Sequence, residues 1–250
     1  MLKIRVIPIL TFNGFGLVKT KQFSNPRMVG NPVQAARVYN SRGVDELVFI
    51  DLNATKQKRK LNLAIARDII KECFMPVGIG GGIDSIDDIN NLLKIGADKV
   101  VIKNQALVNP GFIKEAAHFF GSQCITIAVD AKKNGESYKI HNDLGIDITL
   151  NDFIHQVQDL GAGEVVITSV DNDGMMKGFD IELVATAEKL TNLPIIAVGG
   201  GGDMTHYTEL FSKTNIEAVG SASIFHFTQY TPLDIKRALS TIGKPVRIPQ

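Results

Sequence analysis

The 250-residue sequence has only two cysteines, no marked excess of either charge, and no uninterrupted apolar run of about 20 residues. Without such a run, we expect no transmembrane helix. Lys and Arg number 27 against 26 Asp and Glu, so the net charge of +1 does not favour binding to nucleic acid or to an anionic membrane. Cys73 and Cys124 lie far apart in apolar segments, which predicts buried free thiols and a reducing, cytoplasmic compartment.

Several catalytic signatures are also missing. The five histidines have no metal-ligand spacing, and no Cys/His cluster, P-loop or nucleophile elbow occurs. We therefore predict no metal and no cofactor. His226, in the segment after the last predicted strand, is the histidine placed to line a site, although a surface or core imidazole is the more common role for such a residue.

Eight apolar runs of strand length recur along the chain. They do not alternate with polar residues, which is typical of parallel strands that are buried on both faces. Amphipathic helical patterns lie between them. Asn31–Pro32 and Asn109–Pro110 each open a helix. Ser85 and Asp88 have the spacing of a capping box, and the helix that they open is expected to end at Gly96. The runs cover residues 4–10, 46–52, 75–80, 99–103, 124–130, 164–170, 193–198 and 216–221, and the other helical patterns cover about 60–72, 150–160, 180–190, 204–213 and 231–240.

Eight strands that alternate with eight helices predict an α/β protein, a (β/α)8 TIM barrel with residues 1–250 in a single domain. The chain also contains an internal repeat. ELVFIDLNATK begins at Glu46 and EVVITSVDNDG begins at Glu164, while VGIGGGI from Val77 matches AVGGGG from Ala197. The second half therefore echoes the first, as if two four-strand half-barrels were joined.

Glycine clusters follow the third and the seventh predicted strand. Bare backbone N–H groups in such loops bind phosphate in barrels, although glycines can also serve only to make a tight turn. Because the clusters recur at the repeat offset, we predict two phosphate sites and a substrate with a phosphate at each end. The predicted substrate-binding residues of this pattern are Gly81, Gly82, Lys103, Asn104, Gly200, Gly201, Ala222 and Ser223.

Carboxylates end several strands, and a ring-opening or ring-closing reaction needs an acid and a base on opposite sides of its substrate. Asp130 fits one of these roles, unless it pairs with Lys132 or Lys133. The opposite position, after the first strand, is Thr11, whose hydroxyl cannot act as a general base near pH 7. Asp51, Asp171 and Asp173 also follow strands.

The starts of four strands carry charges of both signs: Arg5, Glu46, Lys99 and Glu164. They form either a ring of ion pairs that closes the bottom of the barrel or a set of solvated strand-end charges. Two long loops, residues 11–30 and 131–148, follow strands and would lie on the opposite, catalytic face. We expect the first of these loops to be mobile without ligand because of its glycines.

From end to end, the chain resembles the cyclase subunit of imidazole glycerol phosphate synthase, the HisF family. The resemblance implies a barrel that receives ammonia from a HisH-like glutaminase in a heterodimer and uses it on a bisphosphorylated small molecule. It also implies that the four strand-start charges gate the entry of ammonia. The matching segments are RVIP at 5–8, DELVFIDL at 45–52, GIGGGI at 78–83, GADKVVI at 96–102, AVDAKK at 128–133, GAGEVVITSVDNDG at 161–174, GGGGDM at 199–204 and SASIFHF at 221–227.

By the same resemblance, Lys19, Asp173 and Gly174 join the substrate-binding residues and Asp130 matches one of two catalytic aspartates. The chain departs from the family at three positions. Thr11 replaces the other catalytic aspartate, Met175 replaces a small hydroxyl residue, and Lys103 replaces an asparagine.

These departures, with the segment at 23–40, make the chain more similar to the WbuZ branch, which is associated with amidation of bacterial surface sugars. Three hypotheses follow. The chain supplies ammonia for sugar amidation together with a glutaminase and a sugar amidotransferase, it is a cyclase of histidine biosynthesis, or it is an inactive phosphate-binding scaffold. We rank them in that order.

Overall fold

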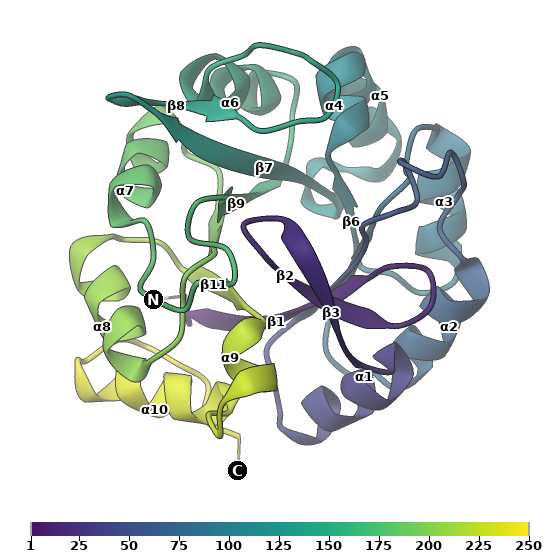
Figure 1. Ribbon diagram of the computed structural model, residues 1–250. Coiled ribbons are helices and arrows are strands. Elements are labelled where there is room, and N and C mark those ends of the chain that lie inside the picture. The colour runs from purple at the N-terminus through teal and green to yellow at the C-terminus, as the bar shows by residue number, and fades with distance from the viewer. Residues whose placement is uncertain (1, 250) are drawn as a thin grey trace.

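Eight parallel strands form a closed barrel in the computed structural model, which describes residues 2–249 (Figure 1). The strand order is β1-β4-β5-β6-β7-β9-β10-β11, and β11 pairs with β1 to close the barrel. The predicted (β/α)8 barrel is therefore confirmed. The strands are β1 Arg5–Phe12, β4 Leu47–Asp51, β5 Val77–Gly80, β6 Lys99–Ile102, β7 Ile125–Asn134, β9 Glu164–Ser169, β10 Ile195–Val198 and β11 Ala218–Ser221.

Eight longer helices surround the barrel, at the positions that the sequence predicts (Figure 1). The Ser85–Asp88 capping box is present, and Asn31 caps the first helix. The helix expected after Asn109–Pro110 is also present, with Pro110 as its N-cap. The helices are α1 Pro32–Ser41, α2 Leu63–Lys71, α3 Ile86–Lys94, α5 Gly111–Phe120, α6 Leu150–Asp159, α7 Ile181–Leu190, α8 Met204–Lys213 and α10 Pro232–Thr241.

The apolar core has two parts. The larger part lies between the outer face of the barrel and the helices, and it includes Phe49, Phe153 and Leu210. The smaller part fills the barrel interior with Ile7, Ile9, Val48, Val101, Val166, Ile196 and Ala218. Burial on both faces explains why the strands are continuous apolar runs in the sequence.

Two short helices show the internal repeat at the level of structure. They are α4 (Asn104–Val108) after β6 and α9 (Ser223–Phe227) after β11. The residues that precede them share an unusual backbone conformation, with φ and ψ of −123° and −80° at Lys103 and of −142° and −64° at Ala222. The two half-barrels thus carry the same device at the same place.

Both long loops contain β-hairpins, which the sequence pattern does not predict. In the first loop, β2 (Leu17–Lys21) pairs with β3 (Ser24–Gly30), and this hairpin crosses the mouth of the barrel (Figure 1). In the second loop, β7 extends to Asn134 and pairs with β8 (Ser137–Ile140).

Two expectations from composition can be compared with the fold. None of the helices between residues 2 and 249 combines the length and the apolar character that a membrane crossing requires. Both cysteines, Cys73 and Cys124, are free thiols, but they are half-buried and not fully buried as expected. Burial raises the pKa of the Cys73 thiol to about 12, so this thiol stays protonated at neutral pH.

Candidate active site

A cavity of about 510 Å³ opens at the carboxyl ends of the barrel strands. Every residue that the sequence analysis assigns to catalysis or substrate binding lines it, from both halves of the chain. This convergence follows from the fold, because the loops after parallel strands all emerge at one end of a barrel. These lining residues are Thr11, Lys19, Gly81, Gly82, Lys103, Asn104, Asp130, Asp173, Gly174, Gly200, Gly201, Ala222 and Ser223.

Two equivalent sets of backbone N–H groups lie at this cavity. Neither α4 nor α9 has a side-chain cap, so the first two N–H groups of each helix remain free to bind an anion, while the third donates to the carbonyl of Lys103 or Ala222. A glycine loop accompanies each helix. A Cβ at Gly81 would lie 2.3 Å from the Asp51 carbonyl oxygen, and one at Gly200 would lie 1.9 Å from the Gly178 carbonyl oxygen. Only glycine fits this backbone.

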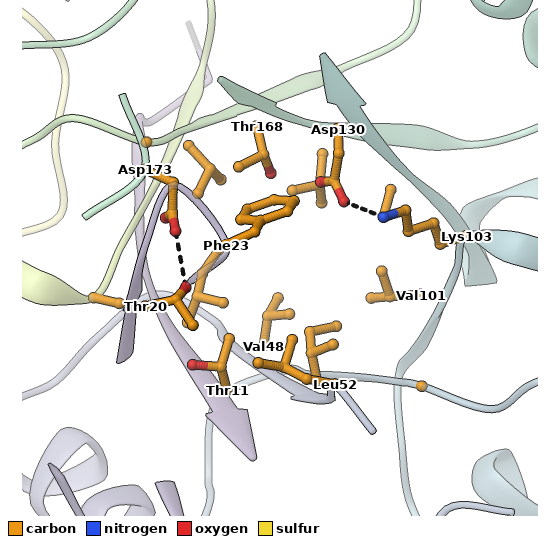
Figure 2. Close-up of a pocket in the computed structure, with 18 of the residues that line it drawn as sticks. Thr11, Thr20, Phe23, Val48, Leu52, Val101, Lys103, Asp130, Thr168 and Asp173 are labelled. Atoms are coloured by element: carbon orange, nitrogen blue, oxygen red, sulfur yellow. Dashed lines mark hydrogen bonds and ion pairs between the residues drawn. The ribbon is translucent and has the colours of Figure 1, made fainter. Parts of the chain in front are cut away.

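Asp130 and Lys103 form an ion pair on one wall of the cavity, with 2.6 Å between the lysine Nζ and a carboxylate oxygen (Figure 2). The alternative that Asp130 pairs with Lys132 or Lys133 is wrong, since Lys133 pairs with Glu182. The wall therefore holds a proton donor beside a proton acceptor.

Thr11 also lines the cavity, as the last inward-facing residue of β1. Its hydroxyl donates a hydrogen bond to the carbonyl oxygen of Val18 in the hairpin. The hydroxyl proton is thus engaged, and no basic side chain accepts it. That Thr11 does not act as a base stays a prediction.

Lys19, on strand β2 of the hairpin, and Asp173 are both buried. Burial lowers the pKa of Lys19, and the nearby Asp173 carboxylate only partly opposes this shift. Burial likewise raises the pKa of Asp173, against the effects of Lys19 and of a 3.1 Å hydrogen bond from Thr20 (Figure 2). Both shifts favour the neutral forms of the two groups.

Phe23 lies across the middle of the pocket, at a position that the sequence analysis did not single out (Figure 2). Its ring centroid is 5.7 Å from the Lys103 Nζ and 5.7 Å from the ring of His141. His141 lines the cavity as well, whereas His226 is not among the lining residues and is a half-buried residue of α9. No local sequence signal marks Phe23, because the contact depends on how the hairpin folds over the barrel.

Asp51, another strand-end carboxylate, already has its partner. Arg59 donates two hydrogen bonds to it, at 2.6 and 2.9 Å, and the backbone N–H groups of Asn53 and Ala54 donate to one of its oxygens. With its oxygens occupied in this way, Asp51 shapes the cavity rim. Among residues 2–249, no group of three or more His, Cys, Asp or Glu side chains is arranged to hold a metal ion.

The opposite end of the barrel carries a closed ring of charges, formed by Arg5, Glu46, Lys99 and Glu164. Arg5 pairs with both Glu46 and Glu164, and Lys99 pairs with the same two carboxylates at 3.1 and 2.8 Å. The alternative of solvated strand-end charges is therefore wrong. Each carboxylate has two cations, and each cation has two carboxylates.

The fold and the cavity define the class: a (β/α)8 barrel protein with a cavity at the carboxyl ends of its strands. The model of a family described as "Histidine biosynthesis protein" matches residues 5–231. The chain belongs to this histidine biosynthesis family.

The curated relatives carry a more specific name. The chain is 42% identical over 253 residues to imidazole glycerol phosphate synthase subunit HisF from Streptococcus mutans, 44% identical over 252 residues to the subunit of that name from Staphylococcus saprophyticus, and 44% identical over 253 residues to that from Staphylococcus aureus. Each match covers 99% of this chain and 100% of the relative. The resemblance to the HisF family is confirmed, while the more specific resemblance to the WbuZ branch remains a prediction.

Proposed function

We propose that the chain is the cyclase subunit of an imidazole glycerol phosphate synthase. In this proposal residues 1–250 act as one domain, in the cytoplasm, as one half of a heterodimer with a HisH-like glutaminase. The relatives' shared name favours this role over sugar amidation, which we ranked first from the sequence. The observation that carries the proposal is the pairing of a charged ring at one end of the barrel with a two-anion cavity at the other.

The ring would admit ammonia, and the cavity would hold the substrate. We assign one phosphate of the substrate to Gly81, Gly82 and the first turn of α4, and the other to Gly200, Gly201 and the first turn of α9. The repeat supports this assignment, because both halves have the same uncapped helix and the same glycine loop. A substrate held at both ends would have its central atoms over Asp130.

Asp130 would move the proton in ring closure, with Lys103 holding its carboxylate in place at 2.6 Å. Lys103 also brings a proton donor to the same wall. In this chain the acid and the base would therefore stand side by side, and not on opposite walls as a carboxylate in place of Thr11 would allow. Lys19, from the hairpin strand β2, and Asp173 complete the charged lining.

The test is an ammonia-dependent cyclase assay on the purified chain alone, with saturating ammonium and the bisphosphate substrate of imidazole glycerol phosphate synthase. We expect turnover at an ordinary enzyme rate, and a loss of about 10²–10⁴-fold in Asp130→Asn. Thr11→Val serves as the matched control, because it removes a hydroxyl that is not needed as a base. The proposal fails if the native chain is inactive and Thr11→Asp restores turnover.

That second outcome would favour the supply of ammonia for amidation of a surface sugar, in a complex with a sugar amidotransferase. Two observations support this second candidate function: position 11 carries a threonine in place of a carboxylate, and Asp130 is held in an ion pair. It predicts that the chain stimulates glutamine hydrolysis by its glutaminase but does not close the imidazole ring. A scaffold without chemistry would bind inorganic phosphate, stimulate no glutaminase and remain inactive with either residue at position 11.

A further inference from the structure

One buried hydroxyl inside the barrel has no hydrogen-bond partner. It belongs to Thr126 on β7, which is only 2% exposed. Within the part of the chain that the structure describes, no donor or acceptor lies within reach of its Oγ1 atom. Buried hydroxyls are normally satisfied, so an unpaired one points to a missing partner such as a small bound molecule.

The register of the strands places this hydroxyl inside the barrel. Thr126 is the Cα partner of Glu164 on β9 and of Val101 on β6. Partners in adjacent parallel strands point to the same face of a sheet. Glu164 belongs to the charged ring, and Val101 belongs to the interior cluster and lines the cavity. Thr126 therefore lies between the ring on one side and the cavity floor on the other.

The cavity reaches close to the ring. Its deepest lining residues on three strands are Val48, Val101 and Val166, each two positions beyond a ring residue on the same strand. Only one layer of inward-facing side chains separates this floor from the ring. Thr126 is in that layer, and so is Gly78, which pairs with Val48 on one side and with Lys99 on the other.

Gly78 leaves space in this layer. A Cβ added there would meet a methyl group of Val48 at 3.4 Å, a methyl group of Val101 at 3.7 Å and the Cβ of Lys99 at 3.8 Å, all ordinary van der Waals contacts. The layer thus contains both an unfilled position and an unpaired hydroxyl, next to the apolar floor residues Val48, Val101 and Val166.

We propose that Thr126 is a binding site for one ammonia molecule on its way from the ring to the cavity. This inference rests on the proposed function, in which ammonia enters at the ring. An apolar surround with one hydroxyl favours a small neutral molecule over an ion, because burial of an unpaired charge costs far more than burial of a polar group. The hydroxyl donates a hydrogen bond to the ammonia lone pair or accepts one from an N–H.

The first test compares Thr126→Val with Thr126→Ser in the ammonia-dependent cyclase assay. Valine has nearly the same shape and removes only the hydroxyl, whereas serine keeps it. We expect Thr126→Val to raise the KM for ammonia about fivefold, the effect of one lost hydrogen bond. The kcat and the KM for the bisphosphate should stay within about twofold, because the lost contact is remote from the chemistry. Thr126→Ser should restore the native KM.

Gly78→Ala gives an independent variant, since its methyl group fits the fold and fills the same layer. It should also raise the KM for ammonia without changing the KM for the bisphosphate. If the native chain turns over and neither Thr126→Val nor Gly78→Ala alters the KM for ammonia, the inference is overturned while the proposed function stands.

A second test does not depend on turnover. Crystals of the native chain and of Thr126→Val, grown with and without ammonium chloride at mildly alkaline pH, should differ at one place. We expect density for one molecule within hydrogen-bond distance of the Thr126 Oγ1 in the native chain and none in the variant. An empty layer between ring and cavity would refute the inference. Density that is already present without ammonium, together with an unchanged KM for ammonia in Thr126→Val, would refute it as well. If the native chain is inactive, the proposed function fails and this measurement still decides the site.

Discussion

Removal of both cations of the charged ring should destabilise the protein more than the sum of the single removals. Arg5 and Lys99 each pair with both carboxylates of the ring. In Arg5→Met or in Lys99→Met, each carboxylate therefore keeps one cation. In the double variant, Glu46 and Glu164 have none, although their side chains are only 3% and 7% exposed.

The sizes follow from this sharing. Each single variant should lose about 2 kcal/mol in the free energy of unfolding, less than the 3–5 kcal/mol typical of a buried charge left alone. The double variant leaves two such charges and should lose about 6 kcal/mol. The expected coupling is about 2 kcal/mol, within the range for residues of one ionic network.

Equilibrium urea unfolding at pH 7.5, followed by far-ultraviolet circular dichroism, measures all four corners of this double-mutant cycle. Lys133→Met is a suitable control, because Lys133 forms an exposed ion pair with Glu182, and such pairs contribute about 1 kcal/mol or less. If the loss in the free energy of unfolding of the double variant equalled the sum of the two single losses, the argument would be refuted. Such additivity would mean that the two cations do not share the same carboxylates.

Two further predictions concern single residues. Burial and the proximity of Lys19 lower the pKa of His226 to about 4, so between pH 6.5 and 4 the unfolded chain binds a proton that the folded chain does not. The free energy of unfolding should therefore fall as pH decreases through this window, by at most about 3 kcal/mol and by less with solvent screening. In urea titrations at pH 7 and pH 5, His226→Asn should not show this loss. An unchanged pH dependence in the variant would contradict the prediction. Gly81→Ala should lower Tm strongly, because φ is +103° and the new Cβ would lie 2.3 Å from the Asp51 carbonyl oxygen. Gly135→Ala, where φ is +62° but no atom lies within 4 Å, should lower Tm only slightly in the same calorimetric scan, and equal shifts would contradict the steric argument.

The barrel itself is predictable from the sequence because its signals are local. Each strand is a continuous apolar run, and each longer helix has its own periodicity. Ser85 with Asp88 predicts the start of α3 by a contact between residues three positions apart. The glycine clusters and the strand-start charges are also readable, since parallel strands put all loops after strands at one end and all loops before strands at the other.

The two hairpins are not predictable in the same way. The segment β3, Ser24–Gly30, has exposed residues on both faces and no alternation. Its strand conformation comes from pairing with β2, and the left-handed backbone at Gln22 and Phe23, with φ of 49° and 60°, has no glycine to signal the turn. The contact of Phe23 with Lys103 and His141 therefore appears only in the folded chain.

The partner of Asp130 shows the same limit. Lys132 and Lys133 are its neighbours in the sequence. On a regular strand, Lys132 would face the same side as Asp130 and Lys133 would face the opposite side. Beyond the barrel end, β7 continues into a hairpin with β8, and Lys133 pairs outward with Glu182. Lys103, which directly follows the adjacent strand β6, takes the place beside Asp130.

The sequence by itself determined the barrel, its repeat and the set of residues that meet at each end, because apolar periodicity and strand direction act through near neighbours. Only the tertiary structure decided which charges pair, what covers the mouth and which buried group lacks a partner. Ion pairs such as Lys103–Asp130 join residues 27 positions apart, and the unpaired hydroxyl of Thr126 reflects the register of three strands. These features depend on distances across the barrel, which closure of the sheet fixes and no local pattern encodes.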